Sequence, residues 1–294
     1  MESLSFQDYQ NLHDQLNEVT ARINNLNATD INKIDSLYFI RGTLHGRMRD
    51  FADAELDFNA AIKINANEWD YYFNRATNYI NQGRFELSIS DLHRAIQLNP
   101  SNYVSYFQLG SACREIKDYI GSVDALNTYI AYFPDDAEAY FLRGHSKLDL
   151  KDYEGAIKDC DEAIACKSDD AQFFVCRGVS RYCLGDKDGA LKDYDQAFMM
   201  DKMVDFDWAI DFNPEDTDAL VVRGGIHIHS GNLSRAMADF NLVLNINPYY
   251  VTAHVGLAFV FNAQGKKTEA ISCMLKAKSL GFQEADEMID IFCN

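Results

Sequence analysis

The four prolines of the chain mark a fixed interval. The spacing from Pro100 to Pro134 is the same as the spacing from Pro214 to Pro248. The segment 67–102 contains the first proline and predicts two helices, which are separated by a tight turn at Gly83 and ended by Pro100. Apolar residues recur every three or four positions on one face of each predicted helix, a pattern typical of amphipathic helices that pack against each other.

Moving this segment along the chain by one proline interval reproduces its pattern in seven copies. With repeat positions counted from 1 to 34, position 8 is Gly or Ala in all seven copies, position 20 is Ala or Ser, and position 4 is large and mostly aromatic. Small residues at positions 8 and 20 allow two helix backbones to approach closely, and the large residue fills the space beside them. The copies begin at residues 35, 69, 103, 137 and 171 and, after an interruption, at 217 and 251.

The residue at the turn, position 15, is Gly in four copies. Glycine adopts the left-handed backbone conformation that commonly ends a helix, which explains this preference. Arg49, Lys117 and Lys151 occupy the position in the other three copies.

The pattern resembles the tetratricopeptide repeat, whose period and spaced small and aromatic residues it matches over about residues 35–282. The resemblance implies an all-α fold, a right-handed solenoid of antiparallel helix pairs with about seven repeats, in which each repeat contacts mainly its neighbours. The expected parts are an N-terminal capping helix in 1–34, repeats 1 to 5 in 35–202, an irregular partial repeat or helix extension in 203–216, repeats 6 and 7 in 217–282, and a C-terminal capping helix in 283–294.

The segment 203–216 breaks the register of the repeats. It matches the end of a second helix, and the interval from Pro134 to Pro214 lies between two and three periods, so part of a repeat has been lost or a short segment added. No Gly or Pro lies between Ala190 and Asn213. We therefore expect one continuous helix over that span and a change in the direction of the solenoid; a kink near 201–204 is the alternative.

A helix over residues 5–26 precedes the repeats, and Ser5 with Asp8 forms a candidate capping box. Its apolar residues, from Tyr9 to Leu26, alternate spacings of three and four, which makes a continuous seam. The seam indicates a capping helix on the first repeat or a short homodimeric coiled coil. We favour the cap because the terminal repeats of a solenoid need to be covered.

Two repeat positions change together. Position 7 is Arg and position 23 is Asp in the same five copies, whereas the other two copies have neither. Because a partly buried Arg needs a partner, we predict an ion pair between the two helices of one repeat, with a structural role; pairing with the Asp of an adjacent repeat is the alternative. The predicted pairs are Arg41–Asp57, Arg75–Asp91, Arg143–Asp159, Arg177–Asp193 and Arg223–Asp239.

In the tetratricopeptide family the first helices of successive repeats line a concave groove, and the resemblance implies that positions 2, 5, 9 and 12 face it. Position 5 is Phe in four consecutive repeats, above mostly short residues at position 9. Such a row predicts an apolar trough for an extended peptide or an amphipathic helix. The alternative is that the rings pack against the second helices or the N-terminal helix. The candidate groove residues are Phe39, Thr43, Phe73, Asn74, Thr77, Phe107, Ser111, Phe141 and His145.

Known functional motifs are absent from the sequence. One subset of the family grips the C-terminal carboxylate of chaperones, but only Asn74 matches that set of side chains, which disfavours a co-chaperone role. The chain has no G-x-x-x-x-G-K-[ST], G-x-S-x-G or H-E-x-x-H sequence, so we expect no catalysis, cofactor or metal. The predicted function is a non-catalytic scaffold or adaptor that binds protein; a regulatory or substrate-recruiting subunit of an enzyme complex is the alternative.

Composition narrows the class of partner and the compartment. The formal net charge of −18 disfavours nucleic acid and suits solubility or a basic protein partner. No apolar run reaches the roughly 20 residues that span a bilayer, and the first residues do not resemble a signal peptide. Seven cysteines without a Cys-x-x-Cys motif predict reduced thiols, and hence a cytoplasmic location with a nuclear one as the alternative.

Overall fold

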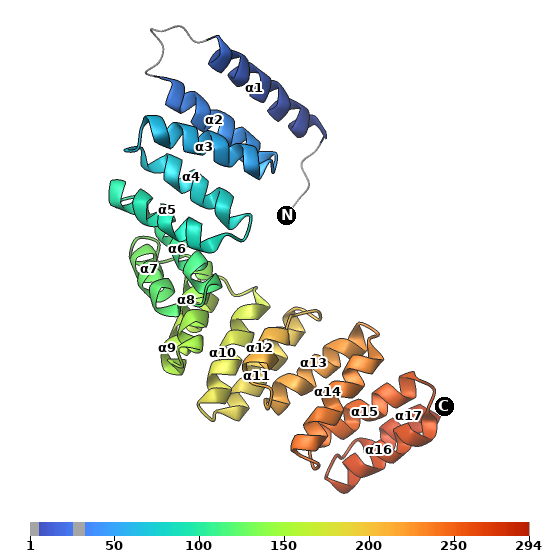
Figure 1. Ribbon diagram of the computed structural model, residues 1–294. Coiled ribbons are helices and arrows are strands. Elements are labelled where there is room, and N and C mark those ends of the chain that lie inside the picture. Colours follow the sequence, from blue (N-terminus) through green and yellow to red (C-terminus); the bar gives the residue numbers. More distant parts are fainter. Residues whose placement is uncertain (1–5, 26–32, 294) are drawn as a thin grey trace. The chain divides into compact units, whose positions relative to one another are not determined.

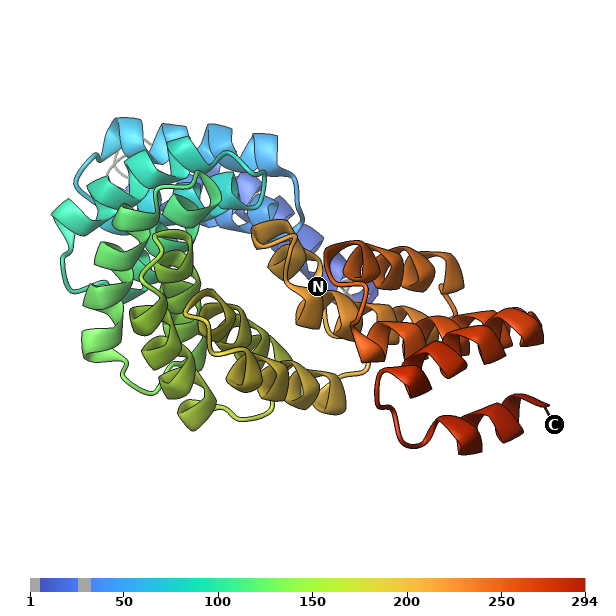
Figure 2. The ribbon, with the colours of Figure 1, turned by 90° about the horizontal axis from the view of Figure 1, so that it is seen from below.

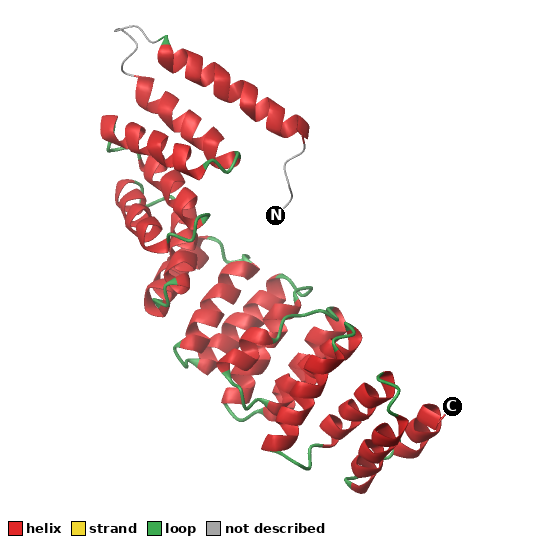
Figure 3. Cartoon of the chain, turned by 45° about the vertical axis from the view of Figure 1, so that its right-hand side comes forward, coloured by secondary structure: helices red, strands yellow, loops and turns green. Residues whose placement is uncertain are grey.

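The computed structural model describes residues 6–25 and 33–293. Those residues form helices joined by short loops and turns, and no strand occurs among them (Figure 3). The predicted all-α class is therefore confirmed. The chain divides into two compact units, Met1–Ser146 and Lys147–Asn294, and the boundary falls inside one helix, α8 (Ala137–Asp149).

The first unit consists of a single helix followed by successive helix pairs (Figure 1). Within each pair the two helices pack together, and each second helix also packs against the first helix of the next pair. This is the alternation expected of a solenoid. The helices are α1 (Phe6–Asn24), α2 (Ile34–Arg47), α3 (Phe51–Ile64), α4 (Trp69–Ile80), α5 (Phe85–Leu98), α6 (Tyr103–Glu115) and α7 (Tyr119–Tyr132), followed by α8 up to Ser146.

The second unit repeats the same plan, and its later helix pairs can be followed in Figure 2. Two complete pairs, α13 with α14 and α15 with α16, follow the interruption. Its helices are α9 (Tyr153–Cys166), α10 (Ala171–Cys183), α11 (Lys187–Met200), α12 (Asp207–Phe212), α13 (Thr217–His229), α14 (Leu233–Ile246), α15 (Val251–Ala263), α16 (Lys267–Ser279) and α17 (Ala285–Cys293).

The turns between paired helices adopt the expected left-handed conformation. The four turn glycines have φ values between 71° and 87°. Arg49, Lys117 and Lys151 occupy the same conformation, with φ values of 68°, 64° and 63°. The geometry of the turn therefore overrides the preference of these three residues for negative φ.

The close approach of paired helices also follows from sequence. At position 8 of repeat 5, a Cβ atom added to Gly178 would lie 2.4 Å from the ring of Tyr194. At the same position of repeat 3, a Cβ on Gly110 would lie 2.6 Å from Leu126. Because these two glycines have no side chain, Tyr194 and Leu126 of the second helices can pack directly against the first helices.

The helices outside the repeats cover the ends of the stack. In the first unit, Leu12 and Val19 of α1 join Leu37 and Leu44 of α2 in one buried cluster, the arrangement of a capping helix. The proposed capping-box residue Ser5 lies outside the described residues. In the second unit, Phe292 of α17 is buried against α16 and the exposed ring of Phe259.

The expectation of one continuous helix across residues 190–213 is wrong. Helix α11 ends at Met200, which is repeat position 30, the position at which α3, α5, α7 and α9 also end. The backbone becomes extended at Asp201, and Val204 and Phe206 then turn inward until they are 3% and 1% exposed. The backbone after position 30 is likewise extended at Asn65 and Lys167, so the end of α11 follows the repeat register and needs no Gly or Pro.

The short helix α12 serves as the end of a missing second helix. Trp208 donates a hydrogen bond from Nε1 to Gln172 of α10, and Gln172 donates in turn to the main-chain oxygen of Asp205. Helix α13 packs against both α11 and α12, so the next repeat stacks on the interrupted one. Among the helices of the described segments, none is long and apolar enough to cross a membrane.

Candidate functional site

The first helices of the first unit form one continuous face. Successive first helices contact each other, α2 with α4 and α4 with α6, whereas the second helices α3, α5 and α7 do not come as close to one another within the described residues. A stack that is tighter along its first helices curves with those helices on the inner side. We call the solvent-facing side of α2, α4, α6 and the start of α8 the first-helix face.

The four phenylalanines of position 5 are half-buried on this face. The ring centroid of Phe39 lies 5.0 Å from that of Tyr71 and 6.1 Å from that of Phe58 on the second helix. Phe107 lies 5.1 Å from Tyr129, again on a second helix. The rings therefore fill gaps between helices and present only part of their surface to solvent, as do Phe73 and Phe141.

A pocket of about 240 Å³ opens on the first-helix face between α2 and α4. It exists because repeat 1 has Gly46 at position 12, where the next two repeats have Ile80 and Arg114; a Cβ added to Gly46 would meet nothing within 4 Å. The structure thus brings three predicted groove residues together with others that the sequence did not single out. The lining residues are Thr43, Gly46, Arg47, Phe58, Asn74, Thr77, Asn78 and Asn81.

Most polar side chains of this pocket already donate their protons to main-chain oxygens. Thr43 donates to Phe39 O at 2.9 Å, and Thr77 donates to Phe73 O at 3.0 Å. Thr77 Oγ1 also lies 3.2 Å from Gln108 Oε1 of α6, so its one proton has two acceptors within reach.

Two asparagines that line the pocket each donate one amide N–H to a main-chain oxygen. Asn74 donates from Nδ2 to Asp70 O at 2.8 Å, and Asn78 donates to Phe51 O at 3.0 Å. Asn78 is 3% exposed, and its Oδ1 atom has no hydrogen-bond partner within the described part of the chain. Such a buried, unsatisfied acceptor costs about 1–3 kcal/mol.

The other end of the first-helix face has a different character. His145 of α8 lies edge-on to Phe141, with ring centroids 5.8 Å apart. Arg114 Nη2 donates a hydrogen bond to Nδ1 of His145 at 2.6 Å. Ser111 is half-buried between these helices. The candidate groove residues therefore divide into a pocket around Asn78 and a separate group around Arg114.

The arginines of position 7 pair with the aspartates of their own repeat in four of the five predicted cases. Both nitrogens that face the carboxylate take part, as in Arg75 Nε and Nη2, which lie 2.7 Å from the two oxygens of Asp91. Burial lowers the pKa of the Arg75 guanidinium, but the hydrogen bonds to Asp91 and the negative charge of Asp91 together raise it above its ordinary value. Arg143 and Asp159 belong to different units, so their pairing stays a prediction. The observed pairs are Arg41–Asp57, Arg75–Asp91, Arg177–Asp193 and Arg223–Asp239.

These arginines also bind the preceding repeat, which sequence reasoning missed. Arg75 donates to Asn59 at 2.5 Å, and Arg143 donates to Asn127 at 2.8 Å. Asn59 and Asn127 share repeat position 25, which is Asn or Asp before most arginine-bearing repeats. Each such arginine therefore ties two neighbouring repeats together as well as the two helices of its own repeat.

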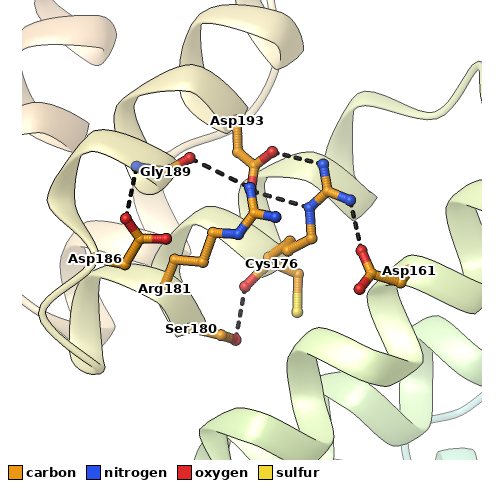
Figure 4. Close-up of polar contacts among 8 residues, drawn as sticks. Asp161, Cys176, Ser180, Arg181, Asp186, Gly189 and Asp193 are labelled. Carbon is orange, nitrogen blue, oxygen red and sulfur yellow. Dashed lines mark hydrogen bonds and ion pairs between the residues drawn. The ribbon is translucent and has the colours of Figure 1, made fainter.

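A second basic residue, at position 11, completes most of these clusters. For example, Arg177 donates to both oxygens of Asp193, and Arg181 Nη1 donates to one of them, Oδ2, at 2.7 Å. Figure 4 shows Arg181 and Asp193 with Asp161 nearby. Asp91 is the exception, since repeat 2 has Tyr79 at position 11. The corresponding second partners in the other repeats are His45, Lys147, Arg181 and His227.

The second unit has a larger hollow, of about 380 Å³, around Arg223 and Asp239. Several of its charged groups pair with each other: Arg223 binds both Asp239 and Asp207, and His227 lies 3.8 Å from Asp239. Burial lowers the pKa of His227, which favours the neutral ring. This hollow is thus part of the structural ion-pair row, and no cluster of metal-ligating side chains occurs in the described ranges 6–25 and 33–293.

Comparison with known proteins agrees with the architecture. Sequence models of the tetratricopeptide repeat match residues 69–102 and 118–171. The human tetratricopeptide repeat protein 6 is 37% identical over 68 residues, which are 22% of this chain and only 13% of that protein.

Solved structures resemble the chain over longer spans. The MamA protein has a TM-score of 0.56 at 22% identity and covers 58% of this chain and 93% of its own. A tetratricopeptide repeat protein from Parabacteroides merdae has a TM-score of 0.53 at 18% identity and covers 88% of this chain and 99% of its own. At such identities these likenesses establish the fold alone. The sequence models identify tetratricopeptide repeats within residues 69–102 and 118–171, and the solved structures have the same kind of fold.

Proposed function

We propose that the chain is a non-catalytic scaffold that binds another protein through the first-helix face of its first unit. The observation that carries this proposal is the pocket between α2 and α4, which lies on that face and contains an unsatisfied buried acceptor. A repeat stack holds such a face in a fixed shape, so the cost of ordering falls mainly on the partner.

The half-buried phenylalanines play a supporting part in this proposal. Because Phe39 and Phe107 already contact Tyr71 and Tyr129, they offer a flat apolar floor and not deep anchoring sites. The net charge of −18 favours a basic partner. The segment of the partner that contacts the phenylalanines is apolar, and the basic residues lie around that segment. An extended peptide or one face of a helix fits both requirements.

Site-specific photocrosslinking tests the proposal. A benzophenone amino acid at Ile40 or Val104, which are 42% and 47% exposed on the first helices, is expected to capture the partner in cells. The matched positions Leu56 and Ile120, 66% and 65% exposed on second helices, are expected not to do so.

The distribution of crosslinks decides the outcome. Capture of the same partner from all four positions, or from the second-helix positions alone, would show that the first-helix face is not the docking surface. If the captured partner is an enzyme, and the first-helix positions alone capture it, the chain acts as the recruiting subunit of that enzyme.

A further inference from the structure

Repeat 3 has a cluster of aromatic rings at the end where α6 begins and α7 ends. The rings of Tyr103 on α6 and Tyr132 on α7 are stacked, with centroids 3.5 Å apart. The centroid of Tyr103 also lies 6.5 Å from that of Tyr106 and 6.3 Å from that of Phe133. We call these four residues the aromatic edge.

Two rings of the aromatic edge are open to solvent. Tyr132 is 55% exposed and Phe133 is 42% exposed. One face of Tyr132 lies against Tyr103, so solvent reaches its other face. Tyr132 and Phe133 occupy repeat positions 30 and 31, which are not aromatic in any other copy; repeat 2 has Leu98 and Asn99 there. The repeat fold therefore does not require these rings, and their exposed surface is available for a contact with another molecule.

Elsewhere in the chain, an aromatic ring at position 4 has a cation of its own. In the four other repeats with Tyr or Phe at this position, the position 7 arginine lies between 5.3 and 5.8 Å from the ring centroid, where the electron-rich face attracts it. In repeat 2, Arg94 at position 26 also lies 5.8 Å from the ring of Tyr72. Repeat 3 keeps the ring, as Tyr106, but has Leu109 and Thr128 at the two cation positions.

The surroundings of the aromatic edge are negative. Asp135, which follows α7, is exposed and makes no ion pair with any described residue. The last turn of α7 contains no basic residue, and the C-terminus of a helix carries a partial negative charge. Within the described parts of the chain, no Lys or Arg lies over any of the four rings. The rings, the carboxylate and the helix end all favour a positive group that the described chain does not supply.

The chemistry of the aromatic edge selects a guanidinium group. A carboxylate or phosphate would be repelled by Asp135, by the end of α7 and by the net charge of −18. An apolar side chain would cover the rings but would leave Asp135 without a partner. A guanidinium is planar, so it stacks on a ring while its N–H groups point to a carboxylate, whereas an ammonium is a more strongly hydrated point charge.

We propose that the aromatic edge binds an arginine side chain of a basic partner protein. The guanidinium stacks on the exposed face of Tyr132 beside Phe133, and Asp135 supplies the opposite charge. The partner thereby provides repeat 3 with the kind of contact that the chain makes internally in other repeats. The proposal rests on the binding of another protein, as the proposed function does, but it places this contact at the end of a second helix and names the residue that the partner presents there.

Three peptides serve as probes in NMR titrations of the full chain with labelled tyrosine and phenylalanine rings. Each has capped ends and one central residue between pairs of glycines: arginine, lysine, or citrulline, which has the shape of arginine without its charge. The arginine peptide is expected to shift the ring resonances of Tyr132 and Phe133 saturably. It is expected to bind about two- to fivefold more tightly than the citrulline peptide and about twofold more tightly than the lysine peptide.

The comparison of the three peptides decides the outcome. Equal binding of the citrulline peptide would show stacking without charge, and equal binding of the lysine peptide would show attraction of charge alone. The absence of a saturable response to any peptide would show that the rings bind none of these groups. Each of these results overturns the proposal.

A double variant checks the location. Tyr132→Leu/Phe133→Asn copies repeat 2, so it is expected to fold and to lose the preference for arginine over citrulline. Tyr249→Leu, which replaces a tyrosine that is 69% exposed in the second unit, is the matched control and is expected to keep that preference. A preference that survives the double variant contradicts the assignment to the aromatic edge.

A second variant tests the carboxylate without changing the rings. Asp135→Asn is expected to weaken binding of the arginine and lysine peptides about twofold and to leave the citrulline peptide unaffected. Asp124→Asn removes an exposed carboxylate two turns before the end of α7 and controls for the change in net charge. Equal effects of the two variants would show that Asp135 is not part of the site.

The outcome separates this inference from the proposed function. Crosslinks from Ile40 and Val104 that persist while the arginine peptide fails to bind would leave the first-helix face standing and remove the aromatic edge. Binding of the arginine peptide without position-specific crosslinks would retain the aromatic edge and remove the first-helix face.

Discussion

The ion pair of repeat 2 offers the sharpest test of how the stack is held together. Asp91 is 6% exposed and is held by one cation, Arg75, whereas the corresponding aspartates of the other observed pairs have a second basic residue within 4.0 Å. Replacement of Arg75 therefore leaves the buried carboxylate of Asp91 without a positively charged partner. The chain itself supplies the apolar substitute, because repeat 3 has Leu109 and Ala125 at the two positions, packed in one buried cluster.

The magnitudes follow from burial. Arg75→Leu removes two bonds to Asp91 and one to Asn59 and leaves the charge of Asp91 unpaired, which costs about 3–5 kcal/mol of unfolding free energy. Asp91→Ala costs less, about 1–3 kcal/mol, because the Arg75 side chain is 17% exposed and keeps its bond to Asn59. The double variant Arg75→Leu/Asp91→Ala copies repeat 3 and is expected to lose about 2 kcal/mol or less, so the coupling energy is at least about 2 kcal/mol.

Hydrogen exchange of the amides in α4 and α5 measures the stability of the two single variants and the double variant. It suits this comparison because a solenoid loses stability mainly in the altered repeat and its neighbours. Asp124→Ala, an exposed carboxylate on α7, controls for the change in net charge. If the losses of the two single variants add to give that of the double variant within about 0.5 kcal/mol, the pair is not coupled and the structural role is refuted.

Three further predictions concern single positions. Lys117→Gly is expected to stabilise the chain by about 0.5–1 kcal/mol in urea denaturation, since Lys117 is held at φ 64°; a loss of stability would contradict this. Gly178→Ala is expected to destabilise by about 1–3 kcal/mol because its Cβ would lie 2.4 Å from the Tyr194 ring, while Gly46→Ala, with open space around it, is expected to stabilise; equal effects would refute the packing argument. Burial raises the pKa of Asp216 from 3.8 to about 6, so the folded state keeps a proton that the unfolded chain releases between those values, and stability falls by about 2–3 kcal/mol as pH rises through that window. In the variant Asp216→Asn, the denaturation midpoint is expected to stay nearly constant between pH 4 and 6. If the midpoint still falls with pH as it does in the unchanged chain, another group is responsible.

The repeat period is enough to predict most of the fold. A constant spacing places every helix pair, every left-handed turn and the close contact at position 8, because each repeat packs in the same way on its neighbours. The Arg–Asp pairs were predictable for a related reason. Two positions that change together in one chain report a contact, and the contact was found within the repeat in the four observed cases.

The features that sequence reasoning missed were visible in the comparison of repeats. Helix α11 ends at Met200, the repeat position at which α3, α5, α7 and α9 also end, so the repeat register was a better guide than the absence of Gly and Pro. The second basic residue at position 11 is visible in the same comparison of repeats that reveals position 7, since His45 and Lys147 occupy it in arginine-bearing repeats. That pattern was sufficient to predict a second basic side chain beside these aspartates.

The pocket illustrates how a repeat protein acquires a site without a motif. The period requires similar residues at equivalent positions, so a site arises where one copy departs from the others. Gly46 is the only glycine at position 12, and its missing side chain leaves a space lined in part by Asn78, which donates to Phe51 O and whose buried Oδ1 has no partner among the described residues. Filling the space with Gly46→Leu therefore distinguishes two roles for that glycine: if the variant folds and still captures the partner through Ile40, the departure is neutral, and if it folds and loses capture, the departure is the binding site.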